Sequence, residues 1–198
     1  MIDRNKNTCG AIAAVLALAF AVPSFAQQAD LILRVDIANG STSGDGSDWN
    51  SDAIRFLQDA LTEADNYLNG EPTHTVDIWV AAGTYLPDQG TGYTLGDRDH
   101  AFHMHDNVRI RGGYAGTEGP LDSPDPSLNV TILSGDLGQS DAFSASYDGN
   151  GALVLQFGNY SDNSKHIVVA QSVGRSAVLD GFFIQGGGGQ STCQGIFC

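Results

Sequence analysis

The sequence is short of basic residues and of long apolar runs. It has 9 lysines and arginines against 23 aspartates and glutamates, so the formal net charge is −14 at neutral pH. Such a chain is repelled by nucleic acid and by anionic lipid, and we exclude both as partners. Its longest apolar run, 11–22, is well short of the roughly 20 residues that cross a membrane as a helix. The sequence therefore predicts no transmembrane segment.

The amino-terminal segment has the layout of a secretory signal peptide. Arg4 and Lys6 precede the apolar run, and after it Ser24 and Ala26 occupy the small-residue positions that a signal peptidase requires. We expect residues 1–26 to be the signal peptide and 27–198 to be the mature chain of a secreted or cell-surface protein. The alternative is a buried amino-terminal helix, but such helices seldom stand at the extreme terminus behind basic residues.

The mature chain is long enough for one domain with a continuous core and too short for two of ordinary size. Cys9 lies in the signal peptide, which leaves Cys193 and Cys198. These two could close a small disulfide loop, because an exported protein meets oxidising conditions. Two thiolates without a nearby histidine or a second cysteine pair cannot complete a zinc site.

One amphipathic helix is predicted over about 51–68. Its apolar residues recur three and four residues apart, on one helical face: Ile54, Leu57, Leu61, Ala64 and Leu68. Ser51 would cap the first turn, and Asn69-Gly70 would end the helix. We expect this helix to lie as a cap over the open end of the core.

After the helix, from about residue 76 onward, short β-rich runs alternate with glycine, aspartate and proline. The predicted strands are 76–80, 101–104, 108–110, 130–133, 153–155, 166–169, 177–179 and 182–184. No second helix separates them, which excludes a doubly wound α/β fold and leaves a sandwich, a barrel or a solenoid. The step from Val108 to Val130 is close to one coil of a solenoid, and several strands end in similar glycine-containing corners. The polar stretch 138–164 would have to loop out of the coil.

Several segments, taken in order, resemble a known family: GDGSDW, LQDAL, VDIWVAAGTYLP, FHMHDNVRIRGGYAGTE, NVTILSGDL and VLDGFFIQGG. They resemble the opening of bacterial secreted right-handed parallel β-helix proteins, which include relatives of the polymorphic outer-membrane proteins and pectate-lyase-like folds without a lyase site. The resemblance covers about 45–187 and implies an all-β right-handed parallel β-helix, a solenoid, with an amino-terminal capping α-helix. Members usually run on for many more coils. We therefore expect 27–198 to be the amino-terminal part of such a domain, cut short at its carboxyl end, where the last coil continues or docks on another molecule.

A metal site is conceivable around Asp97, Asp99, His103 and His105, where carboxylates and imidazoles stand close in sequence. Such a set would suit a divalent transition metal, and carboxylates alone would suit calcium. The alternative is that both histidines face solvent simply because side chains alternate along a strand. Two other aspartate groups lack the closing glutamate of a known calcium loop and are expected to serve as turn and cap residues: 45/48/52 and 122/125.

Exposed aromatic rings are the sequence's clue to carbohydrate, because sugars stack on flat ring faces. In a parallel coil, Val76, Ile78 and Val80 would face inward, and Asp77 and Trp79 outward. The candidate glycan contacts are Trp79, Tyr85 and Tyr114. The alternative is that Trp79 packs beneath the helix or an overlying loop, since large aromatics are usually mostly buried.

Two functions are compatible with this pattern. The first is a non-enzymatic secreted or cell-surface β-helix module for adhesion, surface structure or glycan contact, with carbohydrate or surface proteins as partners. The second is a polysaccharide lyase or glycoside hydrolase whose groove lies mostly on further coils, with outward-facing Arg109 or Arg111 as base near Asp97. We favour the first, because the family pattern marks neither arginine as catalytic and no carboxylate pair can be assigned from sequence.

Overall fold

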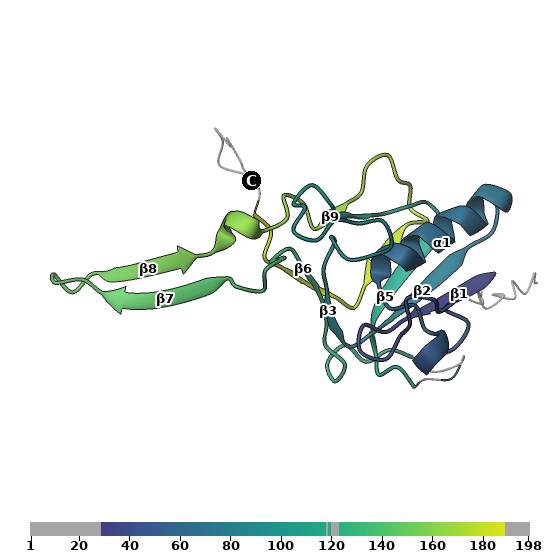
Figure 1. The fold of residues 1–198 in the computed structure, drawn as a ribbon, viewed down its shortest axis with the longest axis horizontal. Helices are drawn as coiled ribbons and strands as arrows, with labels where there is room; N and C mark the ends of the chain where they lie inside the picture. Colours follow the sequence, from purple (N-terminus) through teal and green to yellow (C-terminus); the bar gives the residue numbers. More distant parts are fainter. Residues whose placement is uncertain (1–28, 118, 120–122, 189–198) are drawn as a thin grey trace, which may run out of the picture.

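The computed structural model describes residues 29–117, 119 and 123–188 (Figure 1). The predicted signal peptide and the pair Cys193 and Cys198 lie outside these residues. The described chain is mostly β-strand with one α-helix, an all-β fold in broad terms. None of its helices combines the length and the apolar character needed to cross a membrane.

Three parallel sheets make up the body. The first contains β1 (Leu31–Val35), β2 (Val76–Ala81), β5 (Val108–Tyr114) and β10 (Val178–Asp180) in that spatial order. The second contains β3 (Gly83–Tyr85), β6 (Thr131–Ser134) and β11 (Phe183–Gln185), and the third pairs β4 (Phe102–His103) with β9 (Val168–Val169). From β2 onward the chain visits the first, second and third sheets in the same order, twice in full, and then returns to the first and second.

The strand register stacks aliphatic side chains inside the body. Leu33 pairs with Ile78, Ile78 with Ile110, and Ile110 with Leu179, so one column runs through all four strands of the first sheet. The inward orientation predicted for Val76, Ile78 and Val80 is confirmed, because all three are fully buried in the main core. Parallel strands with this alternation place every second residue on the same face, which builds a continuous apolar interior.

The α-helix α1 (Leu57–Gly70) begins six residues later than the sequence suggests. A short 3-10 turn, η1 (Asn50–Asp52), precedes it. Between this turn and the helix, Ile54 forms isolated parallel β-bridges with Val35 and Ser41. The backbone of Ile54 bonds to Arg34 and Asp36 beside β1, which takes up the groups that an earlier helical turn would need. The expectation that Ser51 caps the helix is therefore wrong; Phe56 holds that position without a side-chain cap.

The helix α1 buries one face against the strands. Its buried residues include Leu57, Ala60, Leu61 and Ala64, all in the main core. The helix packs on β1, β2 and β4, and β1 and β4 are edge strands of their sheets. Burial of an apolar helical face supplies most of the stability of a helix of this length.

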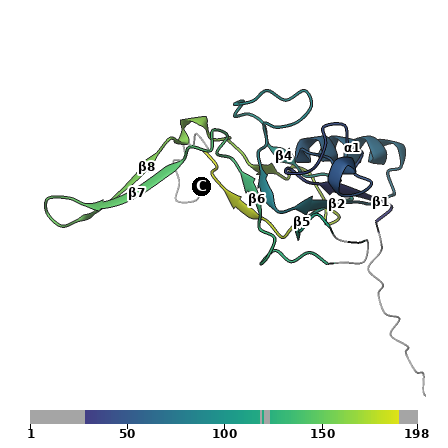
Figure 2. The same ribbon diagram turned by 60° about the horizontal axis from the view of Figure 1, so that its bottom comes forward.

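Three strands were not expected from the sequence, at 31–35, 83–85 and 142–147, whereas the predicted strand 153–155 lies within a longer one, 153–158. The parallel strands start at β1, before the helix, and not at about residue 76. The expected corner after β2 contains β3. Between β6 and β9, β7 (Ala142–Tyr147) and β8 (Leu153–Gly158) form an antiparallel hairpin, followed by the 3-10 turn η2 (Tyr160–Asp162). The stretch 138–164 does leave the body, as a long arm (Figures 1 and 2).

Glycine allows the corners of successive strand turns to stack closely. Gly181, which follows β10, has a positive φ of 78°, and a Cβ there would lie 2.5 Å from the backbone oxygen of Gly112 in β5. Any other residue at 181 would be strained and would push the two corners apart. The glycine-containing corners therefore fix the spacing between β5 and β10.

Candidate functional site

The hairpin β7–β8 has one apolar face and one polar face. The cross-strand pairs on the first face are Phe143 with Phe157, Ala145 with Leu155, and Tyr147 with Leu153. The second face carries Ser144 opposite Gln156, and Ser146 opposite Val154. Strict alternation of this kind is typical of a sheet that covers a core on one side. Here the apolar side covers nothing among the described residues, because the arm stands away from the body (Figure 2).

The apolar face is extensive and uncharged. Phe143 and Phe157 meet at 5.2 Å between ring centroids, and Tyr160 extends the face beyond Phe157 at 6.1 Å. The six large side chains of this face are between 37 and 75 % exposed: Phe143, Tyr147, Leu153, Leu155, Phe157 and Tyr160. With about 200 Å² of surface each, they leave roughly 700 Å² uncovered, more than the largest apolar patch of an ordinary monomer.

The tip and the base of the arm are fixed by polar contacts. At the tip, the carboxylate of Asp148 accepts hydrogen bonds from the backbone N–H groups of Ala152 (2.9 Å) and Asn150 (2.8 Å), which lower its pKa. At the base, the side-chain amide of Asn159 donates to the backbone oxygen of Ser140 across the two strands (2.8 Å). The arm is therefore a closed hairpin at both ends.

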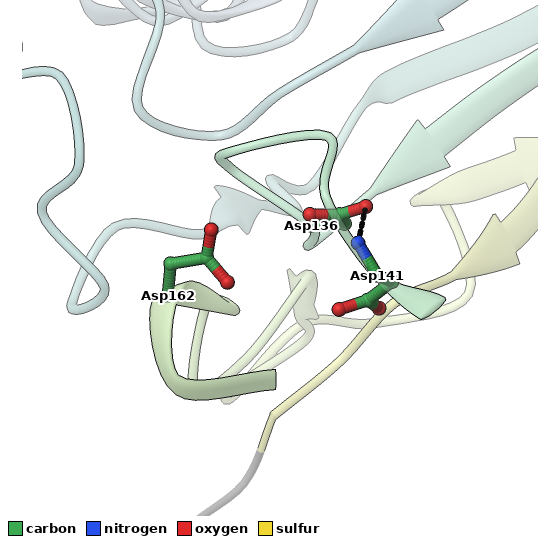
Figure 3. A group of neighbouring side chains, drawn as sticks. All are labelled: Asp136, Asp141 and Asp162. Carbon is green, nitrogen blue, oxygen red and sulfur yellow. Dashed lines mark hydrogen bonds between the residues drawn. The ribbon is translucent and has the colours of Figure 1, made fainter. Parts of the chain in front are cut away.

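Three carboxylates gather where the arm joins the body (Figure 3). Asp136 and Asp141 stand on the segment that leads into β7, and Asp162 stands on η2 after β8. Each offers one oxygen within 4.8 Å of the others. Asp136 accepts from the backbone N–H groups of Ser140 (2.9 Å) and Asp141 (3.1 Å), and Asp162 accepts from the Ser140 hydroxyl (3.3 Å). We call Asp136, Asp141 and Asp162 the acidic cluster.

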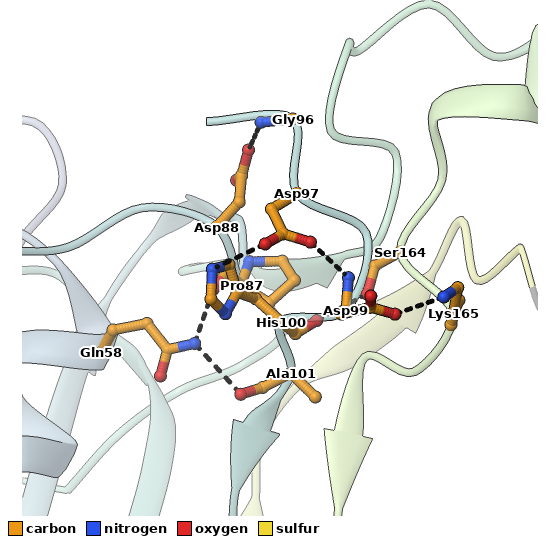
Figure 4. Close-up of polar contacts among 10 residues, drawn as sticks. All are labelled: Gln58, Pro87, Asp88, Gly96, Asp97, Asp99, His100, Ala101, Ser164 and Lys165. Atoms are coloured by element: carbon orange, nitrogen blue, oxygen red, sulfur yellow. Dashed lines mark hydrogen bonds and ion pairs between the residues drawn. The ribbon is translucent and has the colours of Figure 1, made fainter. Parts of the chain in front are cut away.

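Asp97 and Asp99, two of the predicted metal ligands, are engaged in other contacts (Figure 4). Asp97 lies 3.5 Å from the His100 imidazole, and its other oxygen accepts from the backbone N–H of Asp99. The Asp99 carboxylate pairs with Lys165, which lowers its pKa, first through the side-chain hydrogen bond and then through the charge. These contacts hold the loop between β3 and β4 against the segment before β9.

The two predicted histidine ligands lie apart from those aspartates, beside α1. His103 and His105 line a shallow pocket of about 270 Å³ together with Asp65 of the helix. The Nδ1 of His105 is 3.5 Å from the Asp65 carboxylate, and the His103 side chain is exposed. Among the described residues, the four candidates therefore do not form a common ligand set, whereas the acidic cluster does.

The aromatic side chains expected to bind glycan are buried. Trp79 is 5 % exposed, and Tyr85 and Tyr114 are each 1 % exposed. Trp79 does point to the outer face of β2, but the loop that carries Trp49 and Ala53 folds over it. The Trp79 ring stacks on Tyr114 at 4.8 Å and 9°. The expectation that these rings offer open faces to a sugar is wrong, because a second small apolar cluster covers Trp79 and Tyr114, and Tyr85 lies in the main core.

The arginines considered as lyase bases support the sheet. Arg109 pairs with the buried carboxylate of Asp77, its neighbour in β2, and Arg111 lies 3.9 Å from the other oxygen. Asp77 is only 6 % exposed, so this pair is largely shielded from solvent. Both arginines therefore contact a carboxylate of the neighbouring strand.

Asp45 and Asp125, from the other aspartate groups, act as turn residues as expected. Asp45 accepts from the backbone N–H of Ser47 (2.9 Å), and Asp125 from that of Ser127 (3.0 Å) and from its hydroxyl. Hydrogen bonds from the side chain and backbone of Ser47 lower the pKa of Asp45, and those from Ser127 lower the pKa of Asp125. Asp122 lies outside the described residues.

The hairpin arm and the acidic cluster were missed as sites at the sequence level. The arm had a signal, since alternation in FSASY and LVLQF flanks the turn residues DGNG. The cluster had little, because its members come from both sides of the arm. Comparison with family models, with curated proteins and with solved structures finds no match to this chain.

Proposed function

We propose that this chain is a non-catalytic structural module of an exported protein, and that it associates with a second copy of itself through the apolar face of β7–β8. The uncovered face of Phe143, Tyr147, Leu153, Leu155 and Phe157 carries the proposal. Monomeric proteins seldom expose a contiguous apolar face of this size. Burying this face in a dimer would stabilise the dimer, since each Å² of apolar surface removed from water contributes about 25 cal/mol of free energy.

The scaffold in this proposal is a right-handed parallel β-helix, as the sequence resemblance implies. Its support is the repeated order in which the chain visits three parallel sheets, together with the stacked column of Leu33, Ile78, Ile110 and Leu179. Parallel crossovers within one sheet are almost always right-handed. Export is proposed from the signal-peptide pattern of residues 1–26.

Charge favours a second copy over other occupants of the face. The strands AFSASY and LVLQFG contain no charged residue, although the chain carries −14 overall. An equally uncharged apolar face is its natural complement, and an arm that stands away from the body keeps two acidic bodies apart. Anionic lipid would be repelled by the same body.

Size and symmetry also fit a pair of arms. About 700 Å² per copy is close to the roughly 800 Å² that each partner buries in a standard protein interface. A hairpin face is self-complementary about a two-fold axis, since the aromatic residues of one copy can pack on the leucines of the other. The free edges of β7 and β8 add backbone groups that can pair between copies.

The test is the molar mass in solution, measured by light scattering over a range of concentrations. We expect the chain to be dimeric at micromolar concentration, and Phe157→Ser combined with Phe143→Ser to be monomeric. Val154→Ser, which changes the opposite face of the same strand, is the matched control and should remain dimeric. Circular dichroism checks that each variant is folded.

A chain that stays monomeric at all concentrations would overturn the proposal, and so would a dimer that survives both phenylalanine substitutions. Binding of the monomer to phosphatidylcholine vesicles, lost in the same double variant, would assign the face to a membrane surface instead.

A further inference from the structure

We infer that the acidic cluster of Asp136, Asp141 and Asp162, with Asn163, binds a calcium ion at the base of the arm. Neither site considered from the sequence includes these residues. The inference does not depend on self-association, because no member of the cluster belongs to the apolar face of β7–β8, although Tyr160 borders both.

The first observation is the closeness of three negative charges. Their ligand oxygens lie within 4.8 Å of one another, and the ion pairs that the described residues form involve other carboxylates. Arg98 lies nearby, but its guanidinium donates to the backbone oxygens of Asn163 (2.5 Å) and Gly188 (3.1 Å). Like charges this close repel strongly unless a cation neutralises them.

The second observation is independent and concerns buried oxygens. Asn163 is 0 % exposed, and its side-chain amide points into the cluster, since its Nδ2 donates to Asp141 Oδ2 at 2.9 Å. Among the described residues, its Oδ1 has no hydrogen-bond partner, and neither do the buried Oδ1 atoms of Asp141 and Asp162. Native proteins rarely leave buried acceptors unsatisfied, because each costs about 1–3 kcal/mol. Three such atoms, on two members of the acidic cluster and on the asparagine bonded to it, indicate a missing positive ligand.

The surroundings suit a small ion. Gly138 lies against Asp162, and a side-chain methyl there would overlap the Asp162 carboxylate. Asp136 and Asp141 open onto a pocket of about 410 Å³, lined also by Tyr160 and Gly186, through which an ion can enter. The backbone bonds to Asp136 hold that carboxylate in place before any ion arrives.

The donor set selects calcium. All the candidate ligand atoms are oxygens, from three carboxylates and one amide, whereas protein zinc sites are built mainly on histidine nitrogen and cysteine sulfur. Calcium accepts 6–8 oxygens in irregular geometry from turns of this kind, completing its shell with water, whereas magnesium demands a near-ideal octahedron. Extracellular modules typically bind calcium at about 0.1–1 mM, a range that suits an exported chain.

A bound ion would join both ends of the arm. Asp136 and Asp141 precede β7, and Asp162 and Asn163 follow β8, so one ion links the two strands to each other and to the body. Calcium therefore sets how rigidly the arm is held.

Terbium luminescence tests the site directly, because Tb³⁺ replaces calcium at oxygen sites and is excited through a nearby tyrosine, here Tyr160. We expect the full chain to sensitise Tb³⁺, and calcium to displace it while magnesium at equal concentration does not. Asp141→Asn and Asp162→Asn should weaken binding by about tenfold or more. Asp148→Asn, at the tip of the same arm, is the matched control and should bind like the parent.

Thermal unfolding separates a calcium site from a merely structural cluster. At calcium ten times the dissociation constant, the Tm of the parent should rise by roughly 3–6 °C, and the Tm of Asp162→Asn should not. In chelator, Asp162→Asn should be at least as stable as the parent, since it removes one of three repelling charges. No terbium signal, no calcium-induced shift, or Asn variants that keep both would overturn the inference. The same measurements on Phe157→Ser keep the result separate from self-association.

Discussion

Replacing Trp79 by alanine tests whether this ring stabilises the fold from inside. The side chain is 5 % exposed and stacks on Tyr114 at 4.8 Å, and Trp49 packs in the same cluster, 6.0 Å from the Tyr114 ring. Removing a buried aromatic of this size costs about 3–5 kcal/mol. Since domains have only about 5–15 kcal/mol of stability in total, we expect Trp79→Ala to lower Tm by roughly 6–20 °C.

Trp79→Phe is the informative companion. It keeps a ring against Tyr114 but removes the indole Nε1, a buried donor for which the described residues supply no acceptor. Removing an unsatisfied donor recovers about 1–3 kcal/mol, which offsets part of the lost packing. The phenylalanine variant should therefore cost less than half of what the alanine variant costs.

The assay is guanidinium unfolding followed by circular dichroism, with tryptophan fluorescence as a second readout. The chain has 2 tryptophans, and Trp49 and Trp79 are both buried, so native emission should be blue-shifted and resistant to iodide. A loss below about 1 kcal/mol for Trp79→Ala, or native emission quenched as readily as that of the unfolded chain, would refute the packing account. Either result would also make Trp79 a candidate for glycan contact again.

Three further predictions concern polar groups. Asp77→Ala should cost about 3 kcal/mol, because it leaves the largely shielded Arg109 without this carboxylate, and adding Arg109→Leu should recover part of the loss, as measured by urea unfolding. Gln58→Leu should cost about 1–3 kcal/mol, since the buried Gln58 amide donates to two loop carbonyls, and thermal unfolding measures this. The free energy of unfolding should fall as the pH drops below about 4, because hydrogen bonds lower the pKa values of several aspartates in the folded chain. Above the unfolded pKa near 3.9 these ionised carboxylates stabilise the fold. This stabilisation is lost as the pH falls through their lower pKa values in the folded chain. These aspartates are Asp30, Asp45, Asp99, Asp125 and Asp148. Urea unfolding at several pH values checks it, and a flat profile would contradict it.

The strands β2 and β5 could be predicted because their signal is local. Alternating aliphatics at 76, 78 and 80 and at 108 and 110 mark the inner face, and the structure buries them as expected. The start of α1 could not be predicted, because Ile54 carries the correct helical spacing but its backbone is bonded to Arg34 and Asp36, some twenty residues earlier in the chain. A non-local pairing decided that boundary.

At the candidate site, the main error of the sequence-based prediction was to treat outward-facing residues as exposed. Period-two alternation correctly placed Trp79 on the outer face, but alternation says nothing about what covers that face. The cover is the loop with Trp49, which on composition alone resembles a solvated turn. The acidic cluster was missed for a related reason, since Asp141 and Asp162 are brought together only by the closure of β7 on β8.

The two ends of the arm meet in the body of the molecule. The backbone N–H of Ser164 donates to the oxygen of Gly135 at 2.7 Å, so the chain leaves and re-enters the stack of strands at nearly the same point. Loop-closure entropy depends only weakly on what lies between two such points. The arm can therefore be shortened, lengthened or replaced by another sequence without changing the order in which successive strands join the three parallel sheets. The parallel sheets of the body therefore tolerate different insertions at this point, and the same fold can present different binding surfaces.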